Sequence, residues 1–165
     1  MTIMQTDTIA AREQDIVEEF SMFDDWMGKY EYLIELGRDL PLIEEAYKTE
    51  AYRIHGCQAQ VWLRAAFRDD KVYYKADSDA FITKGLISLL VRVLSDQPPA
   101  DITHARLGFI DQIGLKEHLS STRKNGLGEM VKQMKRYALG FGKSETLNPK
   151  SEIRISKSET ISKIE

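Results

Sequence analysis

The sequence predicts an α+β fold, with a three-stranded antiparallel sheet and helices packed against it. Residues 59–68 alternate apolar and polar side chains, which is typical of a strand with one buried face. Asp69-Asp70-Lys71 then predicts a tight turn, and Val72-Tyr73-Tyr74 begins a returning strand. A short strand over Tyr52–Ile54 is expected to complete the meander. On both sides of this region, apolar residues recur at helical spacing.

Two helices are predicted before the sheet. The first covers 8–20, where Asp7 or Thr8 is suited to cap its N-terminus. The second is expected to start after a cap at Asp24 and to place an apolar stripe on one face of 26–37. A glycine and a proline close to the end of this stripe indicate where the helix stops.

Four helices are predicted after the sheet. A strong helical pattern runs to about residue 94, with Asp77 or Ser78 as its expected cap. Two prolines then break the chain, and short helices are expected near Asp101 and over 107–113. The last helix is predicted over 120–137, with an end at the glycines that follow.

The domain organisation predicted is one folded unit over 1–142 and a flexible tail over 143–165. In the tail the triplet Lys-Ser-Glu recurs at Lys143, Lys150 and Lys157, without the paired apolar positions that a coiled coil requires. Its high content of serine and charge favours a flexible segment.

Composition excludes several classes of function. The net charge is −3, which argues against nucleic acid as the main partner, because phosphate binding requires a basic face. No apolar run is long enough to span a membrane, and the first twelve residues lack the pattern of a secretory signal. Together with a single cysteine, these features predict a cytoplasmic protein.

Cys57 is the only cysteine, and it lies in the stretch His55-Gly56-Cys57-Gln58 between two predicted strands. A free cysteine is either a small buried hydrophobe or a nucleophile. Gly56 permits a backbone turn that other residues resist, and Gln58 makes the loop polar, so the functional interpretation gains weight. The predicted catalytic residue is therefore Cys57, with His55 as a weak candidate for its helper.

Other cysteine chemistries fit less well. A hydrolase needs a base and an orienting partner beside the thiol, and the sequence does not place His55, His104 or His118 there. A metal or iron–sulfur site requires three or four ligands, which one cysteine and scattered histidines do not supply. No metal and no cofactor are therefore predicted.

Two charged residues elsewhere have either a structural or a functional role. Asp79 follows a strand and precedes a helix, where capping accounts for one of the nearby carboxylates. Arg123 lies near the start of the last predicted helix, where the helix dipole disfavours a cation. It is either a solvated surface arginine or a residue that serves an anion or carboxylate elsewhere.

Four blocks of the chain resemble the SufE family of sulfur acceptors, which includes the CsdE proteins. They cover nearly all of the predicted folded part, in the family order and at family-like spacing. The blocks are WMGKYEYLIELGRDLP from Trp26, GCQAQVW from Gly56, DSDAFITKGL from Asp77 and HLSSTRKNGL from His118.

The resemblance implies a fold similar to that of IscU-type scaffold proteins, and a function. A family member takes sulfur from a SufS-type, pyridoxal-phosphate cysteine desulfurase, stimulates that enzyme and passes the sulfur to a SufBCD-type scaffold complex that assembles iron–sulfur clusters. A homodimer is also compatible with the resemblance. A second hypothesis is a non-catalytic adaptor that activates the desulfurase; a third, a cluster scaffold, is disfavoured by the cysteine count.

The resemblance also implies roles for individual residues. Cys57 matches the residue that carries the persulfide. Asp79 and Arg123 match residues that shield the loop and help dock the partner, and Asp111 stands where relatives often have glutamate, which keeps the charge but shortens the side chain. Ala59 stands where a serine is common in the family, so the hydroxyl of that serine is absent here.

Overall fold

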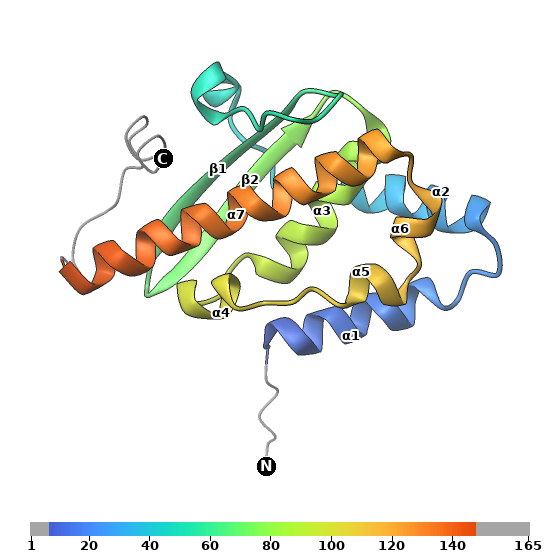
Figure 1. Ribbon diagram of the computed structural model, residues 1–165, viewed down its shortest axis with the longest axis horizontal. Helices are drawn as coiled ribbons and strands as arrows, with labels where there is room; N and C mark the ends of the chain where they lie inside the picture. The colour runs from blue at the N-terminus through green and yellow to red at the C-terminus, as the bar shows by residue number, and fades with distance from the viewer. Residues whose placement is uncertain (1–6, 148–165) are drawn as a thin grey trace, which may run out of the picture.

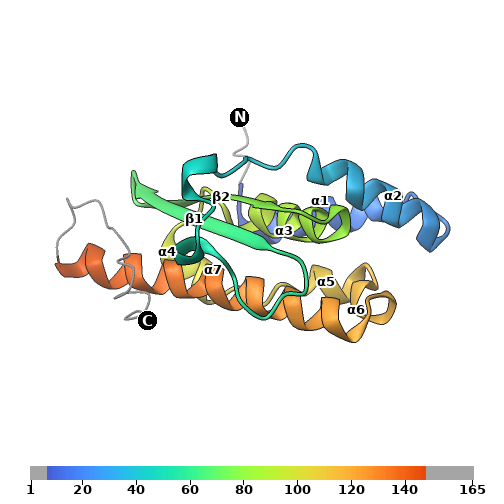
Figure 2. The same ribbon diagram turned by 90° about the horizontal axis from the view of Figure 1, so that it is seen from above.

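The structure is a computed structural model that describes residues 7–147, in which one β-hairpin packs against helices. Strands β1 (Val61–Arg68) and β2 (Lys71–Ser78) form the hairpin. Helix α7 (Ser121–Leu147) runs along one face of the hairpin and of α3 (Phe81–Leu94), as Figure 1 shows. In the turned view of Figure 2, α2 (Trp26–Gly37) lies on the opposite side of this layer from α7.

The hairpin has the register that the alternating pattern predicts. Val61 pairs with Ser78 and Phe67 with Val72, and the apolar residues of both strands share the face that lies towards α7. Asp69 and Asp70 both have positive φ, at 54° and 65°, as a two-residue turn between twisted strands requires. The predicted strand over 59–68, its turn and the returning strand are confirmed, although β1 begins only at Val61.

The predicted third strand is wrong: two strands are present in the described part of the chain. Glu50–Tyr52 forms a 3₁₀ turn (η2), as does Glu45–Tyr47 before it (η1). Only Arg53 forms a bridge to β1, opposite Trp62, where the Ile54 N–H donates to the Val61 carbonyl at 2.8 Å. The next turn, at Gly56, redirects the chain before a second bridge forms.

The two helices before the sheet match the prediction closely. The Thr8 side chain caps α1 (Ile9–Phe20) by accepting from the Ala11 N–H at 3.1 Å. Helix α2 ends at Gly37, as predicted, but its cap is Asp25, which accepts from the Gly28 N–H at 2.9 Å. The prediction of Asp24 is thus wrong by one residue.

After the sheet, α3 lacks the side-chain cap that was predicted. Its cap position is Ala80, with no side-chain hydrogen bond, because the Asp77 carboxylate instead binds Lys48 at 2.7 Å and Lys84 at 3.2 Å. Three short helices follow: α4 (Pro99–Thr103), α5 (Phe109–Gln112) and α6 (Leu115–His118).

Helix α7 is longer than predicted. It continues through both glycines that were expected to end it, and the boundary predicted between 142 and 143 falls inside it. Phe141 is fully buried and stacks on Phe67, with ring centroids 5.4 Å apart, and this burial offsets the low helix propensity of the glycines. The rest of the predicted tail, 148–165, lies outside the described residues.

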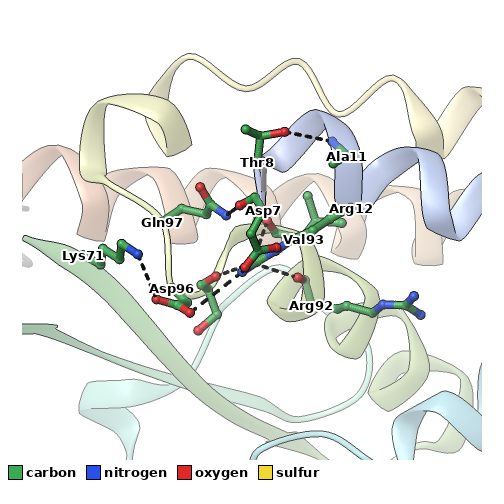
Figure 3. A network of polar contacts seen from close by, with 10 residues as sticks. Asp7, Thr8, Ala11, Arg12, Lys71, Arg92, Val93, Asp96 and Gln97 are labelled. Carbon is green, nitrogen blue, oxygen red and sulfur yellow. Dashed lines mark hydrogen bonds and ion pairs between the residues drawn. The ribbon is translucent and has the colours of Figure 1, made fainter. Parts of the chain in front are cut away.

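The Arg12 guanidinium joins the N-terminal helix to the end of α3 (Figure 3). Its Nη1 donates to the carbonyls of Arg92 at 3.1 Å, Val93 at 3.4 Å and Ser95. A helix leaves its last carbonyls without partners, so Arg12 acts as a C-terminal cap supplied by another helix. Asp7 binds the same guanidinium at 2.8 Å, and this hydrogen bond lowers the pKa of Asp7.

Replacement of Arg12 by methionine should destabilise the protein. Its side chain is only 15% exposed, so the substitution removes hydrogen bonds from a charged donor and leaves several carbonyls unsatisfied. We expect a loss of about 2 kcal/mol, seen as a melting temperature about 4–8 °C lower in thermal denaturation. The control is Arg38→Met, which breaks only an exposed pair with Glu35 and should change stability by about 0.5 kcal/mol or less.

Candidate functional site

The loop that carries Cys57 closes against the first turns of α7. Gly56 has φ 93°, a conformation that other residues rarely adopt. Cys57 is half-buried, and its Sγ lies 3.7 Å from the Gly126 carbonyl, at the length of a weak S–H···O hydrogen bond. A Cβ on Gly126 would lie 3.3 Å from this sulfur, so a glycine here lets the helix approach the thiol.

Asp79 holds the base of the same loop. Its Oδ1 accepts from the Gln60 N–H at 3.0 Å, and its own N–H donates to the Gln60 carbonyl at 3.3 Å. Asp79 follows β2 directly, so the pair extends the hairpin by one position. The carboxylate is exposed, and this link between Cys57's loop and the start of α3 faces solvent.

A pocket of about 290 Å³ opens beside the thiol. Buried Leu86 and Met130 form part of its lining, together with Thr83. Polar groups of the Cys57 loop, of the β2–α3 junction and of the α7 N-terminus complete it. The pocket thus combines apolar residues with a polar border, and it contains the thiol.

Arg123 lines this pocket from the first turn of α7 and is exposed. Its backbone N–H donates to the Ser120 side chain at 3.2 Å, which places Ser120 as the helix cap. Among the described residues, no carboxylate lies within ion-pair distance of its guanidinium. The predicted residues Cys57, Asp79 and Arg123 therefore meet at one pocket, although they are far apart in sequence.

The thiol is held in its protonated form. Burial raises the pKa of Cys57, the Glu129 carboxylate raises it further, and the Arg53 guanidinium lowers it. Sequence reasoning missed Arg53, Gly126 and Glu129. For Gly126 the available signal was the helical spacing of three and four residues from Arg123 through Gly126 to Met130, which places these three on one face of α7. No such signal marks Arg53 or Glu129.

None of the three histidines hydrogen bonds to Cys57. His55, the predicted helper, is 67% exposed and its Nε2 lies 3.2 Å from the Glu50 carboxylate. His104 contacts the Ala100 carbonyl through Nδ1. His118 contacts the Gly114 carbonyl and stacks on Trp26 with ring centroids 4.0 Å apart. A thiol–histidine pair of the hydrolase type is therefore absent from the described residues.

Asp111 is not brought to the pocket. It lies in α5, its side chain is 70% exposed, and its nearest ion-pair partner is Lys116 at 3.5 Å. It does not line the pocket that holds Cys57. Its assignment to loop shielding or partner docking stays a prediction from the family resemblance.

Residues 7–147 offer neither a cluster of metal ligands nor a membrane-spanning helix. No group of three or more histidine, cysteine, aspartate or glutamate side chains is placed there to hold a metal ion. No helix in that range combines the length and the apolar character needed to cross a membrane.

Comparison with known proteins gives a similar fold and clear relatives. A solution structure of a hypothetical protein from Thermus thermophilus matches with a TM-score of 0.64 at 22% identity, over 78% of this chain and 96% of that one. An uncharacterised SufE-like protein of Rhizobium meliloti is 36% identical over 130 residues, which is 76% of this chain and 93% of the relative.

Two further relatives carry more specific names. The SufE-like protein 1, chloroplastic/mitochondrial, of Arabidopsis thaliana is 40% identical over 76% of this chain but 34% of its own length. The sulfur acceptor protein CsdE of Escherichia coli is 31% identical over 67% of this chain and 77% of its own length.

The family model described as SufE, the Fe-S metabolism associated domain, matches residues 14–138. This range runs from α1 to α7 and includes the hairpin, the Cys57 loop and every residue of the pocket. The fold, the relatives and this match lead to one conclusion: the chain belongs to the SufE family.

Proposed function

We propose that this protein accepts sulfur as a persulfide on Cys57 and delivers it to iron–sulfur cluster assembly. The observation that carries the proposal is the position of the only cysteine: it is half-buried, on a loop, at a pocket shared with Asp79 and Arg123. The family description, Fe-S metabolism, and the name of the Escherichia coli relative, a sulfur acceptor protein, support it.

The chemical step needs one thiol and no cofactor. The Cys57 thiolate attacks the outer sulfur of a cysteine persulfide on the donor. A new S–S bond forms at Cys57, the donor S–S bond breaks, and its electron pair leaves on the donor thiolate. The proton of the persulfide stays on the transferred sulfur, so the exchange needs no oxidant or reductant.

Closure of the loop explains how such a thiol is kept from reacting with solvent. In the closed state the sulfur contacts Gly126 and stays protonated, since its pKa is raised. A donor must therefore draw the loop out before transfer. The Asp79–Gln60 hydrogen bonds lie at the base of the loop, and this movement breaks or distorts them. Arg123, exposed beside the pocket, supplies a cation for an acidic group of the donor or for the persulfide anion.

The partners proposed are those that the resemblance to the SufE family implies. The donor is a cysteine desulfurase of the SufS type, which the acceptor stimulates by removing its persulfide, and the recipient is a SufBCD-type scaffold complex. A homodimer is compatible with this function but is not required by it. A reducing cytoplasm suits a protein whose one cysteine has no disulfide partner in its own chain.

The direct test is the Cys57→Ser variant. After incubation with a SufS-type desulfurase and cysteine, we expect the wild-type protein to gain the mass of one or more sulfur atoms at Cys57, and the variant to gain none. The substitution changes a single half-buried atom, so the circular dichroism spectrum should be unchanged. Intact-mass spectrometry followed by peptide mapping gives the result.

The same variant separates acceptor from adaptor. If Cys57→Ser stimulates the desulfurase as strongly as the wild type does, the protein activates its partner without taking its sulfur, and the acceptor proposal fails. Loss of both sulfur gain and stimulation supports the acceptor. The desulfurase rate, measured as alanine released from cysteine, is the readout.

Asp79→Ala should loosen the loop. The variant removes the acceptor of the Gln60 N–H, a hydrogen bond of about 1 kcal/mol at an exposed site, so Cys57 should react with iodoacetamide about two- to fivefold faster. Asp79→Asn keeps an oxygen at the same place and should restore most of the protection. Equal rates for wild type and Asp79→Ala would show that this contact does not hold the loop.

A further inference from the structure

The contact between Glu129 and the Cys57 loop is unusually close. A Cβ placed on Gly56 would lie 2.7 Å from Glu129 Cγ and 3.3 Å from its carboxylate carbon. The backbone of Gly56 therefore lies directly on the Glu129 side chain, one residue before the thiol. Glu129 lies on α7 three residues after Gly126, which contacts the sulfur itself, so the two helix residues hold neighbouring parts of one loop.

Arg53 lies four residues before Cys57, in the segment that leads into the loop. Its side chain is 34% exposed, and its Nη1 lies 3.3 Å from the Glu50 carboxylate. Its Nε is buried without a hydrogen-bond acceptor among the described residues. A buried donor without a partner is costly, so its presence at the base of the Cys57 loop calls for an explanation.

The charged groups around the closed loop come from three directions. Helix α7 contributes Glu129 and Arg123, the β2–α3 junction contributes Asp79, and the entering segment contributes Arg53. His55 is turned towards Glu50. Asp79 is engaged with the Gln60 N–H, and Lys132 lies 3.3 Å from Glu129. Of these groups, Glu129 raises the pKa of the Cys57 thiol and Arg53 lowers it.

We propose that Glu129 and Arg53 are opposed positioning residues that set how readily Cys57 becomes a thiolate. Glu129, packed under Gly56, favours the thiol while the loop is closed against α7. Arg53, at the base of the loop where the chain bridges to Trp62 of β1, favours the thiolate. This inference rests on the proposed function, because it assigns a use to the ionisation of Cys57 in sulfur acceptance.

The arrangement couples loop position to reactivity. Glu129 belongs to α7, whereas Arg53 lies only four residues before Cys57 in the chain. When a donor draws the loop away from α7, the sulfur leaves both the buried contact with Gly126 and the carboxylate of Glu129. Arg53 stays at the base of the loop, bridged to Trp62 of β1. The thiolate should therefore form when the donor is present to use it.

The test is the pH dependence of Cys57 alkylation by iodoacetamide in the full-length protein, without any desulfurase. Glu129→Gln keeps the shape of the side chain that touches Gly56 and removes its charge. Glu129→Lys keeps Cβ and Cγ, is longer, and reverses the charge. We expect the midpoint of the rate profile to fall by about half a unit for Gln, equal to about a threefold faster rate below the midpoint, and by more for Lys. Arg53→Gln should move the midpoint upwards.

The matched control is Glu18→Gln, which removes the same charge from an exposed position on α1 and should leave the profile unchanged. An unshifted midpoint in both Glu129 variants would overturn the proposal. So would a higher rate at every pH with the midpoint unmoved, since that result means looser packing rather than a change of charge. Sulfur gain by mass spectrometry is measured separately, so failure here leaves the acceptor function standing.

Discussion

The packing of α7 against the inner face of the hairpin is the constraint on which the rest of the structure depends. Two tyrosine hydroxyls fix it: Tyr74 donates to the Met134 carbonyl at 2.7 Å and Tyr137 donates to the Leu63 carbonyl at 3.2 Å, both in the buried interior. A hydroxyl buried without a partner is costly, so these bonds disfavour any slide of the helix along the sheet.

That register determines what lies opposite the Cys57 loop. A helix of 27 residues is about 40 Å long, and its first turns reach the far end of the hairpin, where β1 begins. One residue of slip in α7 would place a different side chain against the sulfur. Gly126 is therefore useful only because the tyrosine bonds, two to three helical turns away, keep it there.

Sequence patterns predicted the elements that bury a regular face. The alternation over 59–68 predicted the hairpin, and the helical stripes predicted the long helices. Burial of one face requires apolar residues at the two-residue period of a strand or at the 3.6-residue period of a helix. The predicted third strand was wrong because Tyr52–Ile54 is too short to show a strand period. This segment forms only a single bridge to β1, at Arg53. The predicted end of α7 was wrong because a glycine ends a helix less readily when a residue beyond it is buried. Phe141, which follows Gly140, is fully buried.

Cys57 was predicted from its place in the sequence, and the family resemblance added roles for Asp79 and Arg123; the fold brings all three together at one pocket. The same resemblance placed Asp111 with them, and the structure leaves it on α5. The roles of Glu129 and Arg53 could not be predicted from the sequence, because they depend on how distant segments pack together. No local pattern reports that a helix carboxylate lies under a loop glycine.

The closed loop has a consequence for how the protein survives outside its reaction. Peroxide attacks cysteine through the thiolate, and over-oxidation to sulfinic or sulfonic acid is largely irreversible. A sulfur that stays protonated against Gly126 is a poor target for such oxidants. The sequence has no second cysteine to resolve a sulfenic acid, so the contact with Gly126 would limit oxidative damage at Cys57.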